Sequence, residues 1–246
     1  SAPPLSPNAG AGTRPPTAGK AAPVVSDKSI AVLLFKNLSE EKENAFFADG
    51  MHASILTNLT QLGELRVVSS TSVEQYKDSK KSLRQIAQEL DVAYVLEGSV
   101  QRAGSKVRVT GQLIRAATDE HVWAETYDKD LADIFAIQSE LAQRIAASLH
   151  TALSPQVKKL IERRPTENLA AYDCYVQARE ILRKYNSDRK SAETLLQKAV
   201  RLDPNFVLAW GDLCYVHAST YNAYVDHTDA RIAKCREAME KIIVLV

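Results

Sequence analysis

Residues 94–113 have the sequence YVLEGSVQRAGSKVRVTGQL, a pattern typical of two strands joined by a tight turn. A two-residue loop at Ala103-Gly104 or Gly104-Ser105 keeps Val100 and Val107 on the same side of the pair, whereas a three-residue loop places them on opposite faces. We therefore predict a hairpin with a two-residue turn. Its inward positions recur at every second residue, the period of a half-buried strand: Leu96, Gly98, Val100, Val107, Val109 and Leu113.

The segments around this hairpin alternate between strand and helix patterns. The continuous apolar run 29–35 predicts a first strand that is buried on both faces. Strands are also expected at 65–68 and 121–127, and helices at 47–62, from Ser82 to Leu90, and from Ile134 to a stop near Ser154-Pro155. The expected fold class is α/β (α+β), with a mixed sheet that ends in an antiparallel meander.

Composition sets the limits of the function. The chain has 246 residues, 45% of them hydrophobic and 25% charged, which is enough for two domains. Its formal charge of +1 gives no global electrostatic case for nucleic acid or an anionic membrane. No apolar run reaches the roughly 20 residues of a membrane span. Because the chain begins without Met and stops inside a helical pattern, we expect a fragment, with a span upstream of it as one option.

Residues 1–27 are rich in Pro, Ala and Gly and are expected to form a flexible linker. The three cysteines, Cys174, Cys214 and Cys235, form no CxxC pair. We interpret them as small apolar residues, with a bridge between two of them as the alternative.

Several motifs between Lys28 and Leu153 together resemble the TolB-like amino-terminal domain. This form of the domain occurs in bacterial multidomain proteins that also carry a winged-helix, adenylate or guanylate cyclase, or Ser/Thr kinase module before a membrane span. One departure is Leu34, where the family usually has proline. The matching segments are 29–33, 37–39, 47–50, 94–100, 107–110, 121–128 and 133–138.

Residues 169–246 resemble tetratricopeptide (TPR) repeats, helix pairs with small residues where the helices touch. Residues 154–168 are then a connector. The first repeat is indicated by Ala178, Ile181, Ala192, Leu196, Ala199 and Pro204, and a second by Trp210, Leu213 and Cys214. The resemblance implies an all-α helical segment, truncated in this chain, that binds peptides in a concave groove.

No catalytic or metal constellation stands out. The acidic pairs Glu40-Glu41 and Asp128/Asp130 fall in loops or helix starts, where carboxylates are favoured structurally. His121 and Glu125 lack a third ligand, and Ser99 is not part of a GxSxG elbow. We therefore expect no enzymatic activity, no cofactor and no metal.

Two sets of residues are candidate partner-binding sites. Glu97, Arg108 and Gln112 lie on the outward face of the hairpin, where a solvated sheet face is the alternative. The other set lies along one helix and could line the repeat groove: Tyr172, Tyr175, Arg179 and Arg183. The alternative is that the two tyrosines pack on the preceding domain and the basic residues form a solvated stripe.

A third candidate is a ligand cleft at Asn37, Asp49 and Gly50, where a strand end meets a helix start. The leading hypothesis is a non-enzymatic signalling segment that binds a protein partner of unknown identity and regulates a tethered module. The alternatives are a small-molecule sensor and a periplasmic assembly scaffold. The resemblance implies an extracytoplasmic position at a bacterial inner membrane, whereas unpaired cysteines favour the cytoplasm.

Overall fold

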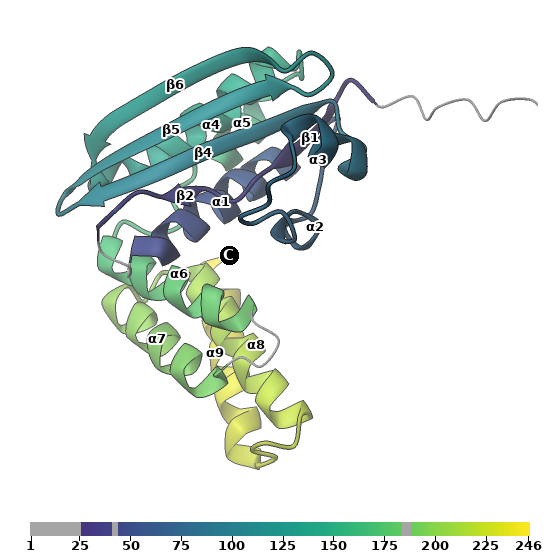
Figure 1. Cartoon of the computed structure of the whole chain (residues 1–246). Helices are drawn as coiled ribbons and strands as arrows, with labels where there is room; N and C mark the ends of the chain where they lie inside the picture. Colours follow the sequence, from purple (N-terminus) through teal and green to yellow (C-terminus); the bar gives the residue numbers. More distant parts are fainter. Residues whose placement is uncertain (1–25, 41–43, 184–187) are drawn as a thin grey trace, which may run out of the picture.

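The computed structural model describes residues 26–40, 44–183 and 188–246, so nearly all of the predicted linker lies outside the described residues. A mixed sheet with helices on both faces forms one part of the molecule. The C-terminal helices extend away from this part at an angle, so that the molecule has a curved outline (Figure 1). We call these the sheet part, β1 to α4, and the helical part, α6 to α9.

The sheet has the strand order β3-β1-β4-β5-β6, with β2 paired to β4. Its central strand β1 is fully buried and runs parallel to both β3 and β4, whereas β4, β5 and β6 form an antiparallel meander. The α+β class and the mixed sheet are therefore confirmed. The strands are β1 (Ser29–Val32), β2 (Lys36–Asn37), β3 (Arg66–Val67), β4 (Tyr94–Ala103), β5 (Lys106–Arg115) and β6 (Glu120–Asp130).

The β4–β5 hairpin has the predicted two-residue turn. Ala103 pairs with Lys106, and Gly104 in the loop has φ +58°, a left-handed conformation that glycine adopts without steric cost. Val100 lies opposite Val109, and Val107 is buried on the same face. The alternation of apolar residues therefore gives the correct register.

Helices cover the two faces of the sheet unequally. The helices α1 (Ala45–Thr60) and α4 (Ile134–Ser148) pack on one face and build the larger core, while α2 (Ser70–Glu74) and α3 (Leu83–Leu90) cover only one end of the other. The predicted capping box of α3 is present, because Ser82 and Gln85 bond each other's backbone amides.

The structure corrects the end of the closing helix. The helix α4 ends at Ser148, and a further helix α5 (Pro155–Glu162) follows where an irregular connector was expected. Pro155 begins this helix rather than ending one, because the first helical position needs no amide hydrogen. The side chain of Ser154 caps α5 by accepting from the amide of Val157. The short elements α2 and β2 were also not predicted from the sequence.

The helical part consists of α6 (Leu169–Arg183), α7 (Arg189–Leu202), α8 (Val207–Asn222) and α9 (Asp229–Leu245). Each packs on the next along the chain. Small residues of these helices are fully buried: Ala178, Ala192, Ala199 and Ala209. The buried core runs continuously from the sheet through α6 to α8.

Candidate functional site

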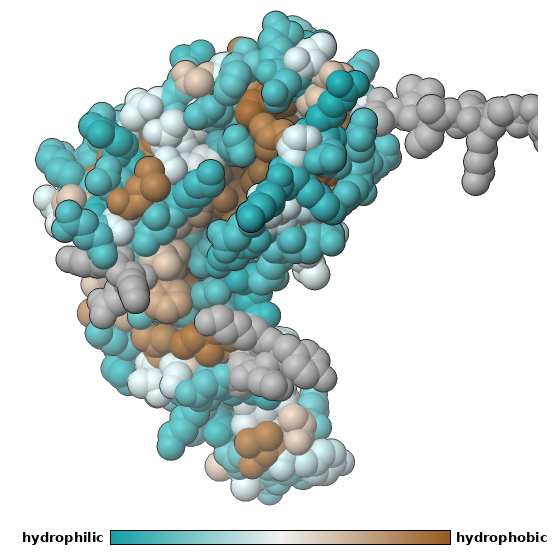
Figure 2. Space-filling view, viewed as in Figure 1, coloured by the Kyte–Doolittle hydropathy of each residue, from teal (hydrophilic) through white to brown (hydrophobic). Residues whose placement is uncertain are grey.

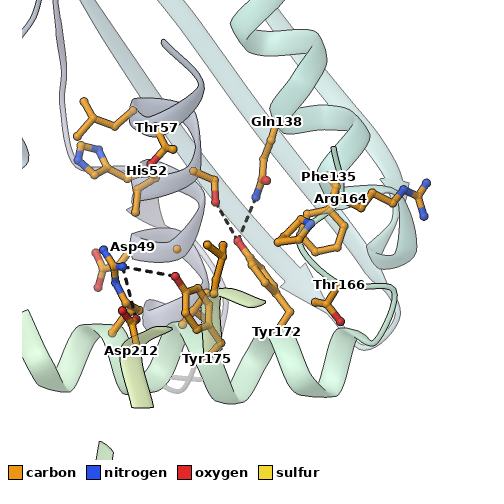
Figure 3. Close-up of a pocket in the computed structure, with 18 of the residues that line it drawn as sticks. Asp49, His52, Thr57, Phe135, Gln138, Arg164, Thr166, Tyr172, Tyr175 and Asp212 are labelled. Atoms are coloured by element: carbon orange, nitrogen blue, oxygen red, sulfur yellow. Dashed lines mark hydrogen bonds and ion pairs between the residues drawn. The ribbon is translucent and has the colours of Figure 1, made fainter. Parts of the chain in front are cut away.

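An open groove of about 1640 Å³ lies where the helical part meets the sheet part. Its walls come from α1, α2, α4, α5, the segment 163–168, α6 and α8, and Figure 3 shows part of this lining. We call it the α1–α6 groove. Segments more than 100 residues apart in the sequence form it, so its shape depends on how α6 docks on α1.

The docking of α6 on α1 requires a glycine. A Cβ atom at Gly50 would lie 2.7 Å from Cγ1 of Val176, closer than real carbon contacts allow. The absence of a side chain at Gly50 therefore lets the two helix backbones approach. Gly50, a residue of the predicted ligand cleft, therefore contacts α6, the helix that carries the predicted partner-binding residues Tyr172, Tyr175, Arg179 and Arg183.

Tyr172 fixes the same contact through its hydroxyl group. Gln138 of α4 donates a hydrogen bond of 3.3 Å to Tyr172 Oη, and Ser54 Oγ of α1 lies 3.0 Å from the same oxygen. The ring is only 3% exposed and packs edge-on against Phe135 at a centroid distance of 4.8 Å. Tyr172 therefore packs against the sheet part, as the second interpretation of the sequence had it, and is not exposed for binding a partner.

A polar cluster of α6 and α8 side chains begins at Tyr175, about one helical turn after Tyr172 in α6. Arg179 donates to Tyr175 Oη at 3.4 Å and pairs with Asp212 of α8 at 3.5 Å (Figure 3). The Tyr175 ring packs on Phe206. Burial raises the pKa values of Tyr175 and Asp212, and the positive charge of Arg179 partly opposes the rise at Asp212. Arg179 itself keeps half of its side chain exposed to the groove.

Arg183 of α6 forms an ion pair with α2. Its guanidinium pairs with Glu74 at 2.5 Å and donates to Glu180 at 2.9 Å, so its charge is neutralised within the protein. Asp49 lies close to this cluster but forms no hydrogen bond or ion pair within the part of the chain that the structure describes. Burial, followed by repulsion from Glu180, raises the pKa of Asp49.

His52 is a buried polar side chain that lines the groove, and it is only 2% exposed. Its Nδ1 lies 3.1 Å from the carbonyl oxygen of Leu33, while its Nε2 has no hydrogen-bond partner among the described residues. Burial lowers the pKa of the imidazole, so the ring is neutral at pH 7. Nδ1 then donates to Leu33, which leaves Nε2 as a free acceptor.

Large apolar side chains are exposed around the same groove. Leu160 of α5 is 52% exposed, Leu208 of α8 50% and Tyr215 of α8 60%, and Leu202 at the end of α7 joins them. Figure 2 shows apolar surface at the waist between the two parts, surrounded by hydrophilic side chains. Apolar surface gathered in this way is typical of an interaction site.

The structure separates the residues singled out in the sequence into three places. The groove brings together Asp49, Gly50, Tyr172, Tyr175, Arg179 and Arg183. Asn37 lies apart from them in β2, where its side chain accepts from the amide of Ser39 at 3.0 Å. Glu97, Arg108 and Gln112 lie on the outward face of the meander.

The outward face of the meander shows ordinary cross-strand pairing. Glu97 lies directly opposite Gln112, and Arg108 pairs with Asp128 of β6 at 2.6 Å. The guanidinium of Arg108 holds the pKa of Asp128 below its usual range. This face is polar and partly solvated.

Sequence reasoning missed His52, Asp212 and Tyr215. His52 could have been found, because it follows Asp49 by three residues on one helix and so shares its face. Asp212 and Tyr215 carried no such signal, since α8 reaches the groove only through the packing of the helical part. Across the described ranges, no group of three or more His, Cys, Asp and Glu side chains is arranged to hold a metal ion. Nor is any helix within those ranges long and apolar enough to cross a bilayer.

Comparison with known proteins gives matches over most of the chain. Residues 26–147 match the model of the second domain of HilA/YgeH-like transcriptional regulators. Over 189 residues the chain is 36% identical to a Rhizobium meliloti (strain 1021) protein named "Putative adenylate cyclase 3". The match covers 76% of this chain but 32% of that protein, so the chain spans about a third of this relative.

Solved structures resemble the chain more distantly. TolB from Acinetobacter baumannii matches 49% of this chain and 28% of its own, with 16% identity and a TM-score of 0.39. Lipoprotein GNA1162 from Neisseria meningitidis matches 50% and 99%, with 19% identity and a TM-score of 0.38. The LpoB C-terminal domain from Salmonella enterica matches 44% and 85%, with 22% identity and a TM-score of 0.33.

Proposed function

We propose that this chain is a non-enzymatic regulatory segment that binds a protein partner in the α1–α6 groove and thereby controls a signalling module in the same polypeptide. The match to part of a protein named as an adenylate cyclase supports the regulatory role, because a longer protein then carries this segment beside another module. The TPR-like pattern of α6 to α9 supports peptide binding.

The observation that carries the proposal is the exposed apolar lining of the groove. Leu160, Leu208 and Tyr215 come from two separate helices, yet all three open into one hollow. The charged groups beside them are largely satisfied internally, since Arg183 pairs with Glu74 and Glu180. A partner segment would therefore bind chiefly through large apolar side chains.

Site-specific photocrosslinking tests the proposal. p-Benzoylphenylalanine is placed at Tyr215, and in a matched variant at Tyr224, an exposed tyrosine beyond the end of α8 that is not part of the groove lining. Irradiation in cells of the source organism should give a discrete protein adduct at position 215 and none at position 224. Equal adducts at both positions, or none at 215, would rule out the groove as the binding surface.

The regulatory part of the proposal needs a separate measurement. A ligand or partner controls a tethered module only if it binds one of its states more tightly. In the full-length protein, Tyr215→Glu should change the activity of the attached module, while Tyr224→Glu leaves it unchanged. If the activity of the attached module were unchanged in Tyr215→Glu, the groove would bind a partner without regulating that module.

A small-molecule sensor is the second candidate, and one observation favours it. Both His52 and Asp49 line the groove, three residues apart on α1, and within the described ranges the Nε2 of His52 has no hydrogen-bond partner and the carboxylate of Asp49 has no hydrogen bond or ion pair. A ligand with hydroxyl or amine donors could satisfy both. A saturable thermal shift with one member of a metabolite panel, lost in both His52→Phe and Asp49→Ala, would establish this function in place of protein binding.

The extracytoplasmic position remains an expectation of the TolB-like resemblance. Whole cells are treated with the membrane-impermeant reductant tris(2-carboxyethyl)phosphine, washed and labelled with a membrane-impermeant maleimide. Cys214 and Cys235 are partly exposed, and the reductant opens any disulfide between them before labelling. Labelling in intact cells supports this position, and labelling only after lysis places the segment in the cytoplasm.

A further inference from the structure

Two cysteines face each other between the last two helices. Cys214 of α8 and Cys235 of α9 lie with their sulfur atoms 3.0 Å apart, and both side chains are partly exposed. The thiol of Cys235 also lies 3.6 Å from the carbonyl oxygen of Cys214. Cys174, the third cysteine, is buried in α6 and is not part of this pair.

Neighbouring contacts hold the two cysteines in register. One turn away along both helices, Arg231 of α9 lies 2.9 Å from Nδ1 of His217 of α8. Arg231 also pairs with Glu193 of α7 at 2.7 Å and with Asp226 at 2.8 Å. Its side chain is only 12% exposed, so these contacts fix the position of α9 against its neighbours.

We propose that Cys214 and Cys235 form a reversible disulfide that links α8 to α9. A disulfide has a sulfur–sulfur distance of about 2.05 Å, so the two atoms need to approach by roughly 1 Å, which a small rotation about χ1 supplies. The bond closes a loop of about 20 residues, a length at which a crosslink measurably restricts the unfolded chain.

The reaction is a thiol–disulfide exchange with a small-molecule disulfide such as oxidised glutathione. One cysteine thiolate attacks the glutathione disulfide and releases one glutathione thiolate, which leaves a mixed disulfide. The second cysteine thiolate then attacks the protein sulfur and displaces the other glutathione. The two protein thiols lose two protons and two electrons, and one glutathione disulfide becomes two glutathione thiols.

The surroundings of the two thiols determine how fast thiol–disulfide exchange occurs. Burial, together with the hydrogen bond to Cys235, raises the pKa of the Cys214 thiol to about 11. Because only the thiolate reacts, exchange at Cys214 should be slow at neutral pH and should accelerate as the pH rises. Alkaline pH should therefore favour the formation of the disulfide through attack by Cys214.

Peptide mapping of the native chain tests the proposal. The reduced protein is incubated with excess oxidised glutathione at pH 8.5 without denaturant, alkylated and digested without reductant. We expect one crosslinked peptide pair that contains Cys214 and Cys235, removed by dithiothreitol and unaffected by Cys174→Ser. The oxidised protein should also unfold at a temperature roughly 5–10 °C higher than the reduced protein.

Three outcomes would overturn the proposal. Glutathione adducts on Cys214 or Cys235 without a crosslinked peptide would show that the second exchange cannot occur in the fold. A crosslink that forms only after urea is added would show that the native helices keep the sulfurs apart. Crosslinks that join two chains would show that the pairing is intermolecular. The deciding measurement uses the unaltered sequence, so it does not depend on the folding of a variant.

Discussion

The hydroxyl oxygen of Tyr172 in α6 lies 3.0 Å from Oγ of Ser54 in α1, across 118 residues of sequence. Gln138 of α4 donates to the same oxygen, so three helices meet at one buried hydroxyl. A tyrosine hydroxyl can accept from Gln138 while it donates to Ser54. This contact positions the helical part on the sheet part and thereby shapes the groove.

Tyr172→Phe should lower the free energy of unfolding by about 1–2 kcal/mol. The variant keeps the ring packing on Phe135 but leaves the buried amide of Gln138 without its acceptor. Urea unfolding followed by circular dichroism measures the difference. Tyr215→Phe is the matched control, because Tyr215 is 60% exposed and should change stability by less than about 0.5 kcal/mol. Equal stability of Tyr172→Phe and the wild type would show that the hydroxyl carries no net stabilisation.

The sequence predicts local structure well because local structure has local causes. The alternation on both sides of Gly104 places Val100 and Val107 on the buried face, and the helical spacing from Phe47 onward predicts α1. The helix starting at Pro155 was missed because proline was interpreted as a stop, although it is equally favourable at the first helical position.

The groove was only half predictable, because it depends on contacts between distant segments. The sequence singled out Asp49 and Arg179 and left packing of Tyr172 and Tyr175 on the preceding domain as an alternative. Nothing in it indicated that α6 docks on α1 and so brings the two sets of residues together. That arrangement depends on the absence of a Cβ atom at Gly50 and on the buried hydroxyl of Tyr172. A pattern of residue types does not reveal such pairings.

Gly50→Ala should destabilise the protein by about 1–3 kcal/mol. The new methyl group would lie 2.7 Å from Cγ1 of Val176, and a β-branched valine in a helix has little freedom to move away. The clash outweighs the gain of up to about 1 kcal/mol that alanine brings to a helix interior. Denaturant unfolding measures the effect.

A double mutant and a control isolate the cause. Adding Val176→Ala to Gly50→Ala should restore part of the loss, so that the two changes are not additive. Gly211→Ala in α8 should instead stabilise by about 0.5–1 kcal/mol, because no atom of the described residues outside the local helix backbone lies within 4 Å of the added Cβ. Destabilisation of the same size in both single variants would contradict a steric origin.

His52 should make stability depend on pH below about 6.5. Burial lowers its pKa in the folded state, so the unfolded chain binds a proton more readily and the free energy of unfolding falls as the pH falls below 6.5. His217 is shifted in the same direction, also by burial. In His52→Gln the fall in stability between pH 6.5 and 5 should be smaller than in the wild type, and in the double variant with His217→Gln it should be smaller still. Urea titrations at several pH values measure these slopes, and an unchanged slope in both variants would assign the pH dependence to other groups.

Asp49→Asn should raise the free energy of unfolding at neutral pH. Burial, followed by repulsion from Glu180, raises the pKa of Asp49, and the positive charges of Lys77 and Arg183 offset only part of this rise. A carboxylate with a raised pKa in the folded state destabilises that state when ionised, and this cost disappears as the pH falls and the group is protonated. The stability difference between Asp49→Asn and the wild type should therefore be positive at pH 7 and shrink toward zero as the pH approaches 4.

Asp128→Asn provides a control of opposite sign. Asp128 pairs with Arg108 on the solvated face of the meander, and this partner lowers its pKa. Neutralising Asp128 should thus reduce stability slightly at pH 7, and the loss should shrink only as the pH falls below about 4. If Asp49→Asn also reduced stability at pH 7, its carboxylate would have a stabilising partner in solution. The attraction to Lys77 and Arg183 would then outweigh the cost of burying the charge.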